Sequence, residues 1–180
     1  ARRMRRFRNH GITTDPRARQ DCGSWFYEMV DLGYNYRITD FQCALGLSQL
    51  GRLPGWVEKR RGLAIRYDTG LGGLAAIRPL SVRPEVRHAY HLYVVRVAST
   101  PTGLTRQGVF HALRQQGIGV NVHYIPVHLQ PFYRGRFGTR PGMCPVAEAA
   151  YEGILSLPLY PALSYESHDG VVNALRLLAE

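Results

Sequence analysis

Lys59 carries the one primary-amine side chain among the 180 residues of this chain. A lysine amine can hold a carbonyl cofactor or substrate as a Schiff base, but it does so where its surroundings desolvate it. Lys59 lies in the charged run Glu58–Arg61, away from the apolar positions of the helix expected there. The sequence also has no glycine-rich phosphate loop, no G-x-S-x-G and no H-E-x-x-H motif. We therefore expect no catalytic residue, and no activity from this chain alone.

His123 and His128 lie five residues apart, a spacing that could bring two imidazoles to one metal ion. No carboxylate or thiol lies near them in the sequence, and Cys22, Cys43 and Cys144 form no C-x-x-C pair. Neither a metal site nor a disulfide framework is expected. For His128, a partly buried histidine bonded to the backbone is the alternative to a ligand-binding role.

The run Gly33–Arg37 carries an amide and a guanidinium two residues apart. The N–H₂ group of Asn35 suits a phosphate oxygen, although Asn35 could instead be a turn residue after Gly33. Arg37 would pair either with a phosphate or with the nearby carboxylate of Asp40. Both alternatives stay open for each residue.

Three longer runs together resemble one family. The first extends from Arg8 through Gly33–Arg37 to Leu50, the second is Gly117–Pro131, and the third is Ile154–Pro161, which we interpret as packing. They resemble the DegT/DnrJ/EryC1/StrS sugar aminotransferases, which use pyridoxal phosphate (PLP). The resemblance implies an α/β fold: the C-terminal small domain of a fold-type I PLP aminotransferase, plus the connecting helices from the large domain.

The resemblance also implies residue roles and a reaction. Asn35 matches an asparagine that, in the family's homodimers, reaches the neighbouring subunit's site and contacts cofactor phosphate or substrate. The implied substrate-binding residues are Asn35, Arg37, Asn121, Val122, His123, Tyr124 and His128. The second run is particularly similar to the pseudaminic acid branch, the UDP-4-amino-4,6-dideoxy-N-acetyl-β-L-altrosamine transaminases. The implied reaction moves an amino group from glutamate, through PLP, to a UDP-linked 4-keto-6-deoxy sugar.

The chain departs from the family pattern because the part that carries the catalytic lysine is missing. We expect a C-terminal portion in three stretches: residues 1–39 from the tail end of the large cofactor-binding domain, 40–75 as connecting helices, and 76–180 as the small α/β domain. Arg2–Phe7 fits this expectation, since it resembles the end of a helix and no N-cap residue precedes it.

Local patterns predict the elements that must position these residues. A helix is expected after a Thr39 or Asp40 cap, and a new one from Pro54, because proline suits a first helical turn. Its apolar face is Trp56, Val57, Arg60, Leu63, Ala64, Tyr67 and Leu71. Further predicted helices are Thr105–Gln116, Val146–Leu155 and His168–Leu178. Predicted strands are Ile77–Leu80, His91–Ala98 (covered on both faces) and Ile118–His123, and Tyr124–Pro141 is expected to be a long loop with only short structure.

Composition leaves rival functions to weigh. The formal net charge is +10, and 22 of the 23 basic residues are arginine. These arginines are scattered, which favours the loss of an acidic other half of the protein, or a nucleotide-sized ligand, over nucleic acid. No apolar run approaches the roughly 20 residues of a membrane helix, and a reduced, cytoplasmic compartment fits the unpaired cysteines. The alternatives are a non-catalytic remnant or interaction module from a split gene, and a basic nucleic-acid-binding domain with Arg2–Arg8 as an arm.

Overall fold

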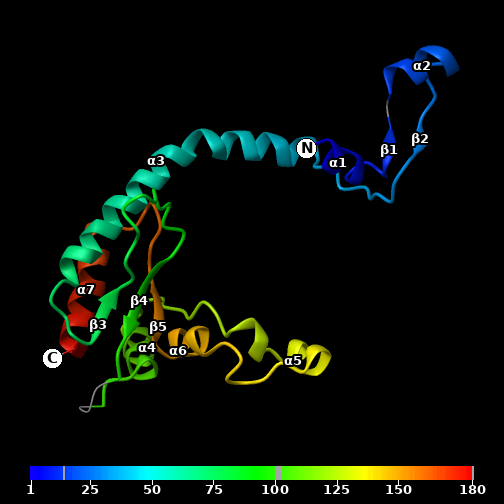
Figure 1. The fold of residues 1–180 in the computed structure, drawn as a ribbon. Helices are drawn as coiled ribbons and strands as arrows, with labels where there is room; N and C mark the ends of the chain where they lie inside the picture. The colour runs from blue at the N-terminus through cyan, green and yellow to red at the C-terminus, as the bar shows by residue number, and fades with distance from the viewer. Residues whose placement is uncertain (14, 100–102, 180) are drawn as a thin grey trace. The chain divides into compact units, whose positions relative to one another are not determined.

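A computed structural model of the chain describes residues 1–13, 15–99 and 103–179 (Figure 1). The chain divides into two compact units, Ala1–Arg52 and Leu53–Glu180. The first contains α1 (Arg2–Phe7), β1 (Ile12–Thr13), α2 (Pro16–Cys22) and β2 (Glu28–Met29). Helix α3 (Asp40–Gly70) begins in the first unit and ends in the second. The second continues with β3 (Ile77–Pro79), β4 (Tyr93–Val97), α4 (Arg106–Gln115), the 3₁₀ helix η1 (Val127–Leu129), α5 (Pro131–Phe137), α6 (Pro145–Gly153), β5 (Ile154–Leu157) and α7 (Tyr165–Ala179).

The first unit is built by backbone contacts rather than by a core. Strands β1 and β2 pair antiparallel, and Asp15 caps α2 by accepting a hydrogen bond from the Arg17 N–H at 2.9 Å. Gly11 and Gly33 let two stretches of backbone meet, since a Cβ on Gly33 would lie 2.0 Å from the Gly11 nitrogen. Among the described residues of this unit Gly11 alone is buried, so the unit buries no side chain.

Helix α3 is continuous through Pro54, so the predicted start of a new helix at that residue is wrong. Proline cannot donate to the carbonyl four residues earlier, which costs about 3 kcal/mol inside a helix. The predicted apolar face is confirmed for the later half of the helix. Its buried residues there are Leu63, Ala64 and Tyr67, with Leu71 just beyond the helix end.

The second unit contains a three-stranded antiparallel sheet in the order β3-β4-β5. Burial alternates along β4: Tyr93, Val95 and Val97 are buried, whereas Arg96 is exposed. The expectation that this strand is covered on both faces is therefore wrong, because one face follows the pleat into the core and the other stays partly open.

Two further predictions in this unit need correction. The predicted strand Ile118–His123 is only an isolated bridge, in which Asn121 pairs with Ser156. The predicted helix Val146–Leu155 ends at Gly153, and strand β5 begins at the next residue. A Cβ on Gly153 would lie 3.0 Å from the Val97 carbonyl oxygen, so a glycine permits the close approach of α6 to β4.

The core lies between the inner face of the sheet and the helices α3, α4 and α7. Helices α4 and α7 pack on each other, and Thr105 caps α4 through a 3.0 Å hydrogen bond from the Gly108 N–H. The largest fully buried side chains are Tyr67, Leu71, Ile77, Val95, Val109, Leu113, Leu155, His168 and Leu175. Full burial of each apolar side chain contributes roughly 1.5–3 kcal/mol relative to exposure.

Candidate functional site

The Asn35 segment is held against the end of α1 by backbone hydrogen bonds. The Tyr34 N–H donates to Phe7 O at 2.7 Å, and the Tyr36 N–H donates to Arg8 O at 2.9 Å. Asn35 itself forms a bridge with Asn9. This pairing makes residues 34–36 extended, so the side chains of Asn35 and Arg37 share one side of the segment.

Asn35 and Arg37 bond directly to each other. The Arg37 Nε–H donates to Asn35 Oδ1 at 3.1 Å, and both residues are exposed. The described residues show no ion pair between Arg37 and Asp40, which was one of the two predicted roles of this arginine. Because the amide oxygen already accepts from Arg37, the Asn35 N–H₂ group and the rest of the guanidinium remain as donors. Such a pair suits an anionic oxygen.

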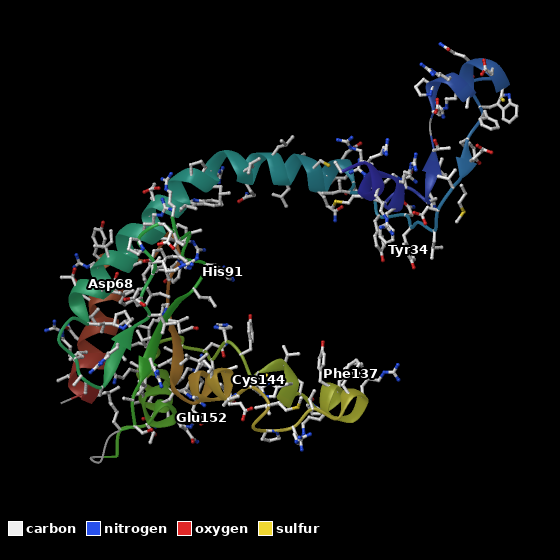
Figure 2. All side chains as sticks on the ribbon, viewed as in Figure 1. Tyr34, Asp68, His91, Phe137, Cys144 and Glu152 are labelled. Atoms are coloured by element: carbon white, nitrogen blue, oxygen red, sulfur yellow. The ribbon has the colours of Figure 1, made fainter. Side chains whose placement is uncertain are left out.

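Tyr34 and Tyr36 flank Asn35 in the sequence, and their rings pack together with that of Phe7. Tyr34 and Tyr36 stack with ring centroids 5.2 Å apart, and Phe7 meets Tyr34 edge-on, also at 5.2 Å. Tyr34 is drawn in Figure 2 beside the end of α1. These contacts add to the backbone hydrogen bonds and fix the extended geometry from which Asn35 projects.

The second group of predicted residues follows the Asn121–Ser156 bridge. The Asn121 N–H donates to Ser156 O at 3.2 Å, and the Ser156 N–H donates to Asn121 O at 2.8 Å. The Asn121 side chain turns back to accept from the Val122 N–H at 2.8 Å. Two residues on, His123 Nδ1 lies 2.8 Å from Ser156 Oγ. The edge of β5 thus anchors this segment twice, through the backbone and through a serine hydroxyl.

Tyr124 is an exposed residue of this group. Its side chain is 73% exposed, and its ring meets the His123 ring edge-on at 4.7 Å. The His123–Tyr124 peptide bond is cis. Because Ser156 holds the His123 ring, the pair presents an imidazole edge and a phenol hydroxyl, two groups that hydrogen-bond to sugar or phosphate oxygens.

His128 has a different environment from the one that its neighbours in sequence suggest. Its Nε2–H donates to Glu148 Oε1 at 2.8 Å, and the two side chains are only 11% and 23% exposed. No carboxylate lies near His128 in the sequence, but the fold supplies one, because Glu148 lies on α6, twenty residues later. The backbone-bonded alternative is also not what the structure shows: the partner of Nε2 is a side chain.

These contacts do not amount to a metal centre in the described structure. Within residues 1–13, 15–99 and 103–179, no group of three or more His, Cys, Asp or Glu side chains is arranged to hold a metal ion. Cys22, Cys43 and Cys144 are all unpaired. None of the described helices combines the length and apolar character that crossing a bilayer requires.

Two residues of the site were missed by the sequence reasoning, Ser156 and Glu148. Ser156 lies in a run interpreted as packing, and its role depends on a strand that the periodicity did not predict. The sequence offers one signal for Glu148: it is the first acidic residue after Glu85, so the long stretch before it contains only basic and neutral residues.

Comparison with known proteins identifies the family. The model of the DegT/DnrJ/EryC1/StrS aminotransferase family matches residues 1–176. The chain belongs to this family. The spore coat polysaccharide biosynthesis protein SpsC of Bacillus subtilis is 41% identical over 155 residues, which cover 86% of this chain and 40% of SpsC. The resemblance inferred from the motifs is thereby confirmed at the level of the family.

Solved structures give the same result for the fold. The putative sugar aminotransferase Spr1654 from Streptococcus pneumoniae, in its PMP form, matches with a TM-score of 0.85 at 33% identity, covering 99% of this chain and 44% of that one. Helicobacter pylori PseC, an aminotransferase involved in the biosynthesis of pseudoaminic acid, matches with a TM-score of 0.80 at 28% identity, covering 98% and 45%. The chain has the α/β fold of these enzymes and spans less than half of their length.

Family aminotransferases depend on PLP, and Spr1654 has also been solved in a PLP form. The residues of this chain fit that cofactor only in part. Asn35 and Arg37 offer donors for a phosphate, but Lys59 is exposed on α3 and has no hydrogen bond or ion pair within the described structure. Nothing there desolvates the amine or aims it at a bound carbonyl. No catalytic step through the cofactor can therefore be assigned to this chain.

Proposed function

We propose that this chain is the C-terminal portion of a PLP-dependent nucleotide-sugar 4-aminotransferase. Residues 1–39 would be the tail end of the large cofactor-binding domain, 40–75 the connecting helices and 76–180 the small domain. The observation that carries the proposal is the family match over residues 1–176 of a chain that spans 44% of Spr1654 and has no suitably placed lysine. Alone, the chain would be inactive.

In the complete enzyme, PLP would carry an amino group from glutamate to the 4-keto carbon of a UDP-linked 6-deoxy sugar. The residues of this chain would bind and orient. Asn35, reaching into the site of the second subunit of a homodimer, would donate its N–H₂ group to a phosphate oxygen, and Arg37 would add a guanidinium donor. The similarity to PseC and SpsC supports a sugar substrate. The proposed compartment is the cytoplasm.

The second subsite would be a wall against the sugar nucleotide. It would comprise Asn121, Val122, His123, Tyr124 and His128. The support is local geometry: Ser156 holds His123 at 2.8 Å, and Tyr124 stays exposed beside it. A positioned imidazole and a free phenol can each bond sugar hydroxyls or a diphosphate, which is the chemistry that a nucleotide sugar offers.

A binding experiment separates this proposal from its rivals. Calorimetric titration of the chain with UDP-N-acetylglucosamine should give binding that weakens about tenfold in Tyr124→Ala, the loss expected for one or two hydrogen bonds. Tyr165→Ala, which alters a similarly exposed tyrosine at the start of α7, is the control and should bind as the wild type does. Salt-sensitive binding of duplex DNA without binding of UDP sugars would instead support the nucleic-acid function. Binding of neither ligand would support the non-catalytic remnant or interaction module.

The assignment as a C-terminal portion has its own test. The codons upstream of Ala1 should encode a lysine followed closely by glycines, in the same reading frame or in a neighbouring gene. If the gene and the intact mass of the natural protein show that translation starts at this chain and no such gene lies beside it, the portion proposal fails.

A further inference from the structure

One carboxylate, that of Glu148, gathers bonds from three places along the segment that follows Tyr124. Oε1 accepts from His128 Nε2 at 2.8 Å and from the Cys144 N–H at 3.2 Å. Both carboxylate oxygens accept from the Gly142 N–H at 2.9 Å. In addition, the Thr139 hydroxyl donates to the backbone oxygen of His128 at 2.6 Å. The segment is therefore closed at its far end onto the first turns of α6, where Cys144 is labelled in Figure 2.

Helix capping explains only part of this arrangement. A glutamate near the start of a helix commonly reaches back to the N-cap amide, which here is the Cys144 N–H. Capping requires neither the bond to Gly142, two residues before the N-cap, nor the bond to a histidine in η1. Two bonds thus remain that serve the preceding segment rather than α6.

Charge supports the same interpretation. Between Tyr124 and Cys144 the side chains that are charged at neutral pH are Arg134, Arg136 and Arg140. This segment contains no carboxylate of its own. Glu148 is partly buried, and its pKa is held below the ordinary value by the Gly142 N–H bond first and by the His128 bond second. The carboxylate therefore stays ionised where the segment needs an acceptor.

We propose that Glu148 is a positioning residue for the sugar-nucleotide wall. By fixing His128, Gly142 and Cys144, its carboxylate sets the path of the chain from Tyr124 onward, and so where the Tyr124 hydroxyl and the His123 ring lie. Ser156 anchors the near end of this path and Glu148 the far end. The inference rests on the proposed function for the identity of the ligand. The clamp, meaning the hydrogen bonds from His128, Gly142 and Cys144 to the Glu148 carboxylate, does not depend on that function.

The test compares two glutamates of α6 that differ in their contacts. Glu148→Gln removes the charge and leaves one carbonyl oxygen for several donors. Glu152→Gln removes the same charge from an exposed side chain one turn later, which has no bond in the described structure, and Glu152 is labelled in Figure 2. Amide hydrogen exchange is measured in both variants and in the wild type.

The exchange arm decides whether the clamp exists. In Glu148→Gln the amides of Gly142 and Cys144 should exchange about tenfold faster or more, as expected for losing a bond to a charged acceptor. Residues 121–128 should also exchange faster, and Glu152→Gln should match the wild type. Unchanged exchange in residues 121–128 would overturn the positioning role even if Gly142 responds.

The binding arm decides whether Glu148 acts through His128. UDP-N-acetylglucosamine is titrated into the wild type, Glu148→Gln, His128→Gln and the double variant. If the two residues act as one unit, the double variant should bind no more weakly than the worse single variant. Additive losses, or unaltered binding in Glu148→Gln despite faster exchange, would overturn the proposal. If the wild type binds no UDP sugar, the proposed function fails and the exchange arm still decides the clamp.

Discussion

The units Ala1–Arg52 and Leu53–Glu180 are stabilised by different forces. In the second, a sheet and three helices bury a contiguous apolar cluster, and Leu155, Ile77 and Val95 have no exposed surface. In the first, backbone hydrogen bonds and two close-packed glycines define the path, while Trp25 and Phe41 are 74% and 91% exposed. Apolar surface of this kind is typical of faces that are covered in a larger assembly. The comparison predicts that the second unit stays folded through its own core, whereas the first opens when its backbone pairing is disturbed.

The largest effect is expected from the core of the second unit. Leu155→Ala should lower the free energy of unfolding by about 2–5 kcal/mol, because the lost side chain leaves a cavity between sheet and helices. Leu177→Ala, on α7 but 74% exposed, should change it by no more than about 0.5 kcal/mol. Urea unfolding followed by circular dichroism measures both. Equal losses for the two variants would mean that this unit lacks the described core.

A smaller and local effect is expected in the first unit. Gly33→Ala places a methyl group 2.0 Å from the Gly11 nitrogen, so the pairing of residues 7–11 with 31–36 should open. Limited proteolysis should then cut within residues 1–39 while the unfolding of the second unit is unchanged. Gly46→Ala is the matched control: its Cβ meets nothing within 4 Å, and alanine should favour α3 by roughly 1 kcal/mol. If Gly33→Ala also unfolds the second unit, the two units are not independent.

The smallest effect concerns pH. His168 is fully buried, its Nε2–H donates to Leu63 O at 3.1 Å, and burial lowers its pKa. The unfolded state therefore binds more protons, so stability should be complete above about pH 6.5 and fall as the pH drops toward the lowered value. His168→Gln should reduce that slope between pH 7 and 5. Asp169, whose pKa is lowered by Arg66, contributes the same sign, but only in a more acidic window. An identical slope in variant and wild type would contradict the assignment.

Sequence patterns predicted the elements that carry their own boundary signals. Helix α4, predicted as Thr105–Gln116 and observed as Arg106–Gln115, has buried apolar residues at helical spacing, a Thr105 cap and Gly117 after its end. The start of β5 was missed because Ile154 continues the apolar spacing of α6, so the predicted helix ran past Gly153, where α6 ends and approaches β4 closely. Pro54 failed as a boundary signal for the converse reason, since α3 tolerates one missing hydrogen bond.

The candidate site also contains residues that the sequence indicated and residues that only the structure reveals. The family resemblance pointed to Asn35 and Arg37, and the structure adds that they bond to each other. Ser156 and Glu148 act across 33 and 20 residues of sequence, so no local pattern could pair them with their histidines. Polar contacts at that range become visible only once the sheet and α6 are in place.

The central claim is that this chain can line a sugar-aminotransferase site but cannot hold the cofactor covalently. Incubation with PLP, reduction with borohydride and peptide mass analysis test it directly, with amino transfer from glutamate to a UDP-linked keto sugar assayed in parallel. We expect no reduced adduct on Lys59 above the level of a non-specific surface lysine, and no amine product. A stoichiometric adduct on Lys59 together with repeated turnover by the purified chain would contradict the account.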